Sequence, residues 1–241
     1  MNKPTITNRK MQRVRLLFIV VLITTASTLS GCGSRQIFSA QFDKQPIDDA
    51  LIPKADVGFF REGPFGGASV VAAPDAGDTA HWVQIVPSAG PDTWAELDAF
   101  FTENQAKDGH YLFTARLFVP SGSRAGINFG FGDITHTEFL ELDFPAAGIE
   151  MPMPGGSPGS PGVCCFPRDQ VFTVTVDFTV GPTSKATVTL GGAAHGSFDV
   201  PLSGSPNQEP RSNFGSVDFW SDSHSKTGPF FVNDISVLYS P

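Results

Sequence analysis

The sequence has little basic charge and little that would form helices. Sixteen Lys and Arg stand against 24 Asp and Glu, which gives a formal net charge of −8. After residue 33, apolar residues do not recur at the three- and four-residue spacing of amphipathic helices, whereas two-residue alternation recurs along the chain. An acidic chain repels nucleic acid and anionic lipid head groups, so we expect no nucleic-acid partner. The fold class that the pattern predicts is all-β.

Patterns for binding transition metals are also missing. The chain has three cysteines and five histidines, and no His-Glu-x-x-His motif or other close ligand spacing occurs. Cys164 and Cys165 are adjacent and have no His nearby, which disfavours a tetrahedral zinc site. In an oxidising compartment they would either form a vicinal disulfide or remain free or intermolecularly paired thiols. A disulfide between neighbours closes almost no loop, so it would stabilise the fold little.

The longest apolar run is short and lies near the N-terminus. It covers residues 16–23, follows a segment with five basic residues and no acid, and fades into Thr and Ser before residue 31. A membrane-spanning helix needs about 20 apolar residues. A basic start followed by a short apolar run is instead typical of an export signal, which we predict over residues 1–31.

The signal ends in Leu29-Ser30-Gly31-Cys32, which resembles the lipobox of bacterial lipoproteins. The resemblance implies cleavage before Cys32, a lipid (palmitate) on that cysteine, and a short tether over residues 32–37. Gly33 stands where lipoproteins of the inner membrane typically carry Asp, so the resemblance points to the outer membrane, on its periplasmic or its surface face. The remaining chain would have 11 basic and 24 acidic residues, so the lipid must provide the membrane attachment. An ordinary cleaved signal or a short membrane anchor is the alternative.

Strand-like segments follow one another through the rest of the chain. The clearest, residues 172–180, alternates Phe and Val with Thr and Asp. Gly181-Pro182-Thr183-Ser184 then predicts a turn into a partner strand over 185–190. Further strands are expected at 81–86, 93–101, 110–119, 127–131, 137–144, 197–200, 216–220 and 230–239. About a dozen strands with one apolar and one polar face predict a two-sheet antiparallel β-sandwich of jelly-roll type.

A stretch rich in Pro and Gly interrupts this pattern at about 145–167. Pro removes hydrogen-bond donors and Gly weakens strand order, so the stretch cannot hold a strand ladder. Loops of this length are uncommon in compact domains unless they are functional or disordered. We therefore expect one domain over 38–241, with this loop as a surface excursion or as the rim of a binding site.

Three segments resemble strands of carbohydrate-binding jelly rolls and concanavalin A-like sandwiches. Residues 228–237, Gly-Pro-Phe-Phe-Val-Asn-Asp-Ile-Ser-Val, resemble the closing strand, residues 38–46 the opening strand, and residues 111–120 the central strands. In some of these modules the Asp of the closing strand helps to bind a structural calcium ion. The resemblance would nominate Asp234, with Asp43 as its partner, although calcium takes six to eight oxygen ligands.

Two carboxylates share one face of the strand expected at 137–144. Glu141 and Asp143 project to one side, because residues two apart on a strand lie on the same face. Concanavalin A-like glycoside hydrolases have a similar strand, Glu-x-Asp-x-(x)-Glu, whose last Glu is the catalytic acid. Here Pro145 and Ala146 stand at that position. The incomplete motif favours carboxylates that are solvated or contact a ligand, and we nominate no catalytic residue.

Tryptophans beside polar residues are the candidate platforms for a sugar. Aromatic rings can stack on sugar rings while carboxylates bind the hydroxyls. Trp220 alternates with Phe219 and shares a face with Asp218, and Trp94 lies near Glu96. The alternative for each Trp is burial, which is the more common place for a single Trp. The predicted ligand-binding residues are Trp220, Asp218, Glu141, Asp143 and Trp94.

These observations predict an outer-membrane lipoprotein that binds a glycan or another envelope ligand without catalysis. One alternative is a structural or assembly lipoprotein that binds another envelope protein, which an exposed apolar patch would favour. Another is a polysaccharide hydrolase or lyase. That function would need a further carboxylate, or a His and a Tyr, close to Glu141 in space.

Overall fold

The computed structural model describes residues 33–48, 52–63, 67–87, 93–102, 107–130, 140–144, 166–191, 193–200, 214–222 and 228–241. All of them belong to a compact unit over Cys32–Pro241. The signal segment, Cys32, Cys164 and Cys165 lie outside the described residues, so lipidation and the state of the thiols stay predictions. Within these ranges, no helix is long and apolar enough to cross a membrane.

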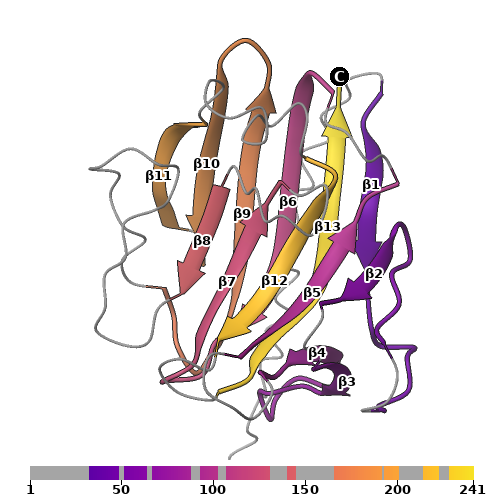
Figure 1. Ribbon diagram of the computed structural model, residues 1–241. Helices are drawn as coiled ribbons and strands as arrows, with labels where there is room; N and C mark the ends of the chain where they lie inside the picture. The colour runs from indigo at the N-terminus through magenta and orange to yellow at the C-terminus, as the bar shows by residue number, and fades with distance from the viewer. Residues whose placement is uncertain are drawn as a thin grey trace, which may run out of the picture. The chain divides into compact units, whose positions relative to one another are not determined.

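Two antiparallel sheets lie one in front of the other (Figure 1). The larger sheet has the order β11 (Ala193–Val200), β10 (Ser184–Leu190), β9 (Val171–Val180), β6 (Gly109–Phe118), β13 (Phe230–Ser240), β4 (His81–Ile85) and β3 (Ala68–Ala72), with β1 (Arg35–Ala40) also paired to β13. The five-stranded sheet has the order β2 (Phe59–Glu62), β5 (Trp94–Phe100), β12 (Ser216–Asp222), β7 (Arg124–Phe129) and β8 (Leu140–Phe144). The prediction of an all-β, two-sheet sandwich is confirmed.

Strand β9 shows how the sequence produces this architecture. Its Phe172, Val174, Val176 and Phe178 are buried, while the Thr and Asp residues between them face outward. Pleating places alternate side chains on opposite faces, so the two-residue pattern separates core from surface. The expected turn at 181–183 joins β9 to its antiparallel partner β10.

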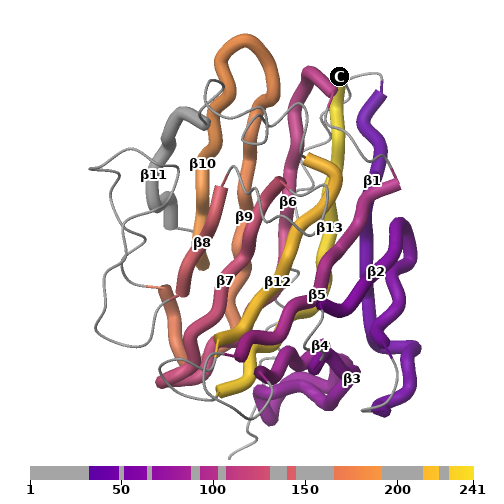
Figure 2. Tube along the Cα trace, viewed as in Figure 1, coloured from indigo at the N-terminus to yellow at the C-terminus, as the bar shows by residue number. Residues whose placement is uncertain are grey.

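The opening and closing strands lie side by side, as Figure 2 shows for the indigo β1 and the yellow β13. This pairing already includes Arg35, opposite Tyr239, and Gln36, opposite Leu238. The tether expected over residues 32–37 is therefore wrong at its C-terminal end. The backbone of residues 35–37 lies along β13, so the domain begins before residue 38.

Other strand predictions were wrong in extent or missed. β7 begins at Arg124, whereas a strand was expected over 127–131, because the outward-facing Gly126 conceals the alternation. β2 and β3 were not predicted, since four or five residues give too few alternations to recognise. Much of the Pro- and Gly-rich loop, residues 145–165, lies outside the described residues.

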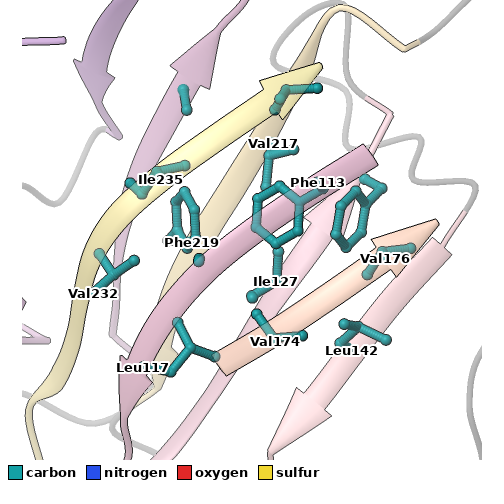
Figure 3. Packing of buried hydrophobic residues seen from close by; sticks show 14 of the residues in the cluster. Phe113, Leu117, Ile127, Leu142, Val174, Val176, Val217, Phe219, Val232 and Ile235 are labelled. Carbon is teal, nitrogen blue, oxygen red and sulfur yellow. The ribbon is translucent and has the colours of Figure 1, made fainter. Parts of the chain in front are cut away.

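The core fills the space between the sheets (Figure 3). Phe113 and Val174 of the larger sheet face Ile127 and Phe219 of the five-stranded sheet. Burial of each such side chain contributes about 1.5–3 kcal/mol relative to exposure. At one side, Phe166 packs on Phe144 with ring centroids 5.0 Å apart, so the chain is back at the core immediately before β9.

Candidate functional site

The outer face of the five-stranded sheet is polar, although its inner face belongs to the core. Leu97, Val217, Ile127 and Leu142 point inward and are buried. Their neighbours along each strand therefore point outward. We call the outward set the polar face, and it consists of Phe59, Arg61, Trp94, Glu96, Asp98, Phe100, Arg124, Gly126, Asn128, Glu141, Asp143, Ser216, Asp218, Trp220 and Asp222. It contains all five residues that the sequence predicts for ligand binding.

One row of polar side chains crosses all five strands of this face. The strand register aligns Arg61, Asp98, Asp218, Asn128 and Glu141, each on a different strand. Neighbouring strands lie about 4.8 Å apart, so the row is about 20 Å long. Arg61 donates from Nε and Nη2 to Asp98 Oδ2 at 3.1 and 2.9 Å, and Asn128 Nδ2 donates to Asp218 Oδ2 at 3.2 Å. These bonds hold several side chains of the row in place.

Trp220 lies in the next row, between Glu96 on one side and Gly126 on the other. Its indole occupies the space above Gly126, and its Nε1 donates to Asn128 Oδ1 at 3.1 Å. Only 9% of Trp220 is exposed. The expectation of an exposed stacking ring is therefore wrong, because the neighbouring glycine leaves room for the indole to pack down against the sheet. What remains correct is that Trp220 and Asp218 share a face.

Arg124 joins carboxylates from the two strands beside its own. Its Nη2 lies 3.0 Å from Asp143 Oδ2 and its Nη1 lies 2.8 Å from Asp222 Oδ2. Burial raises the pKa of Asp143, and the ion pair with Arg124 opposes that rise. The second carboxylate oxygen of Asp143, Oδ1, is buried and has no hydrogen-bond partner. In the described part of the chain it is thus a buried acceptor without a donor.

An aromatic pair that was not predicted from the sequence lies at the β2 edge of the polar face. Phe59 stacks on Phe100 with centroids 4.9 Å apart and planes within 8°, and the Arg61 guanidinium carbon lies 4.7 Å from the Phe100 centroid. Phe59 is 57% exposed, whereas the next residue, Phe60, packs edge-on against Phe38 in the core. A Phe-Phe-Arg sequence on a recognised strand would have revealed this outward ring, but the strand itself was not predicted.

Asp43 and Asp234, the residues nominated for calcium, have different protein partners. Asp43 Oδ1 accepts a hydrogen bond from the His81 backbone at 3.1 Å. Asp234 accepts one from Arg116 at 3.2 Å and borders a polar cavity of about 250 Å³ that Asp56 also lines. No group of three or more His, Cys, Asp or Glu within the described ranges could hold a metal ion. The calcium site stays a prediction that these contacts do not support.

Neither a protein-family model nor a curated protein matches the sequence. Solved structures do match. An endo-1,3-β-glucanase from Streptomyces sioyaensis has 14% identity and a TM-score of 0.53, over 88% of this chain and 98% of that one. The carbohydrate recognition domain of Emp47p has 10% identity and a TM-score of 0.52, over 85% and 96%. The alginate lyase Aly36B, solved with an alginate trisaccharide, has 8% identity and a TM-score of 0.54, over 86% and 99%.

At these identities the likeness shows the fold alone. The chain has the concanavalin A-like jelly-roll β-sandwich, as the strand resemblances predict. Carbohydrate recognition domains, glycan hydrolases and glycan lyases share this fold. The fold alone therefore gives no function for this chain, and a function has to be argued from the polar face.

Proposed function

We propose that the domain binds a glycan across the polar face without transforming it. The observation that carries this proposal is the row from Arg61 to Glu141, which crosses every strand of the five-stranded sheet. A line of donors and acceptors about 20 Å long suits an extended chain of sugar rings better than a small compact ligand. Binding to a preformed sheet also avoids the cost of ordering loops.

Phe59 and Trp220 have different roles in this proposal. Phe59 is exposed and backed by Phe100, so it offers a flat apolar surface to a sugar ring. Trp220 is buried and holds Asn128, which in turn holds Asp218. Trp220 is thus a positioning residue rather than the stacking platform.

A glycan array probed with the full chain tests this proposal. The protein is kept in a detergent that has no sugar head group, because such a head group would compete for the site. We expect reproducible binding to one glycan class, and measurably weaker binding of the same glycan by Phe59→Ala and by Glu141→Gln. The matched control is Thr179→Ala, an exposed position on β9 of the larger sheet. Equal loss in the control, or unchanged binding in both variants, would overturn the proposal.

We also propose attachment to the outer membrane through a lipid on Cys32. The support is the lipobox-like Leu-Ser-Gly-Cys sequence, together with the start of β1 at Arg35. Only two residues separate Cys32 from that strand, so a lipid would hold the domain close to the membrane surface. Labelling of cells with a palmitate analogue should mark the wild-type protein and leave Cys32→Ala unmarked. Label on the variant would contradict the proposal.

A hydrolase is the second candidate, because of the carboxylates on β8. Glu141 lies two residues from Asp143, whose pKa burial raises, and a raised pKa is what a general acid needs. Arg124 nevertheless binds Asp143, which stabilises its charged form. Release of reducing ends from the bound glycan, lost in Glu141→Gln, would establish the hydrolase. Binding without any release would support the non-catalytic module.

A lyase that uses tyrosine near Glu141 has less support. The chain has only two tyrosines, Tyr111 and Tyr239, and they lie on β6 and β13 of the larger sheet. Their hydroxyls donate to the backbone carbonyls of Lys107 and Asp108. Glu141 belongs to the other sheet, so neither tyrosine shares its face.

The protein-binding alternative also lacks a supporting feature. The large apolar side chains that are exposed in the described ranges are Ile47, Ile52, Phe59, Val86 and Leu238. They come from several separate segments and from both sheets. Single exposed apolar residues are normal on a soluble domain and do not define an interface.

A further inference from the structure

The polar face carries more negative charge than its cations can balance. Its six carboxylates are Glu96, Asp98, Glu141, Asp143, Asp218 and Asp222. Its two cations, Arg61 and Arg124, already bind carboxylates of the face at 2.8–3.0 Å. Five of the six carboxylates, all except Glu141, are at most 8% exposed, so water screens them poorly.

The rest of the chain does not hold enough permanent cations to reverse this balance. The other described cations do not belong to the strands of this face. Arg35 and Lys185 lie on β1 and β10 of the larger sheet, and Lys44, Lys54 and Lys107 lie outside the strands. Arg116 pairs with Asp78 and Asp234, and Arg168 donates to backbone carbonyls. After the signal segment, only Arg211 and Lys226 lie outside the described ranges. Even both of them together with Arg61 and Arg124 would give four cations against six carboxylates.

An acidic ligand would therefore meet repulsion, and among the described residues no arginine of the face is reserved for it. Recognition of a carboxylate normally uses a guanidinium fork or an ammonium group. Hydroxyl groups, in contrast, are neutral, so they can donate hydrogen bonds to carboxylates without charge repulsion. Glu141, the most exposed of the six carboxylates, is such an acceptor.

We infer that the polar face selects glycans without acidic groups and rejects polyuronates. This inference rests on the proposed function and adds the class of glycan. The fold does not decide the question, because the structures that share it include a 1,3-β-glucanase and an alginate lyase. The charges of this chain distinguish neutral from acidic glycans. The carboxylates of the polar face are poorly screened, so they repel a ligand that carries carboxylates of its own.

Pairs of polysaccharides with one backbone and different charge provide the test. Titrations of the full chain would compare a β-1,4-glucan with a β-1,4-glucuronan, and a β-1,4-mannan with a polymannuronate, next to other neutral glycans from the array. We expect binding to a neutral member and at least about tenfold weaker binding to its uronate partner at low salt, with a smaller difference at high salt.

A variant of the polar face with one carboxylate fewer tests whether negative charge causes the weaker binding of uronates. Glu141→Gln removes one negative charge from the row and should raise the affinity for the uronate relative to the neutral glycan by about threefold or more. Asp177→Asn removes the same charge from the exposed outer face of β9 and should leave that ratio unchanged. A uronate that binds as tightly as its neutral partner would overturn the inference and leave the proposed function standing. Absence of binding to every glycan would overturn the proposed function itself.

Discussion

The indole of Trp220 lies over Gly126 of the neighbouring strand. A Cβ atom at Gly126 would come within 2.4 Å of Cε2 and Cζ2 of that indole, closer than atoms can approach. The ring therefore fills the space of a missing side chain, and it reaches Asn128 with its Nε1. This relationship links β12 to β7 and fixes part of the row that we propose as the binding surface.

Gly126→Ala should consequently disturb both stability and binding. The added methyl group must push the indole away, which we expect to lower the free energy of unfolding by about 1–3 kcal/mol. Glycan affinity should fall as well, because Asn128 loses its partner. Gly181→Ala is the matched control, since a Cβ at Gly181 meets nothing within 4 Å. Urea denaturation and titration of both variants check this, and two indistinguishable variants would contradict it.

Arg124→Met should destabilise the domain most strongly near neutral pH. The substitution leaves Asp143 and Asp222, whose side chains are almost fully buried, without their shared cation. We expect a loss of about 2–4 kcal/mol, less than for a fully buried pair because the guanidinium is partly exposed. The loss should shrink in acid, because burial raises the pKa of Asp143 and that carboxyl then takes up a proton. Asp143→Asn in the same chain should restore part of the stability, and a double variant no better than Arg124→Met would contradict this account.

Asp78 should add stability at neutral pH that disappears in acid. A hydrogen bond from the Ala80 backbone and the ion pair with Arg116 hold the pKa of Asp78 below its usual value. A carboxyl with a lowered pKa stabilises the folded state above its unfolded pKa, and this contribution is lost as the pH falls through the folded value. Asp78→Asn should thus cost about 1 kcal/mol at pH 7 and almost nothing at about pH 2. Denaturation curves at both values test this, and an equal cost at both would be inconsistent with it.

Phe59→Ala should weaken glycan binding while leaving the fold intact. The ring is more than half exposed, so its removal should change the free energy of unfolding by no more than about 0.5 kcal/mol. Loss of a stacking ring should weaken binding by about tenfold. Leu238→Ala removes an exposed apolar side chain from β13 and serves as the control. If both substitutions lowered the affinity equally, Phe59 would have no special role.

The sequence allowed good prediction where a feature depends on one strand alone. The alternation in β9 predicts its buried face, and the spacing of Glu141 and Asp143 predicts that they point the same way. Features that depend on the register between strands could not be predicted from the sequence. Nothing in the sequence aligns Trp220 with Gly126, so the packing of the indole over that glycine could not be foreseen.

Short elements were the other source of error. The strand that carries Phe59 and Arg61 has four residues, too few to show a period. Its place at the edge of the sheet comes from pairing with β5, which lies far along the chain. The aromatic end of the polar face was missed for this reason, although the carboxylates at the other end were found.

The most direct test uses the indole N–H signals of the three tryptophans. Trp94 and Trp220 lie on the polar face, whereas Trp82 lies on β4 of the larger sheet and donates to Asp78. In a heteronuclear NMR titration with the bound glycan, we predict that the Trp94 and Trp220 signals shift together and that the Trp82 signal stays in place. A shift of Trp82 with Trp94 and Trp220 unmoved would place the ligand elsewhere and contradict the account.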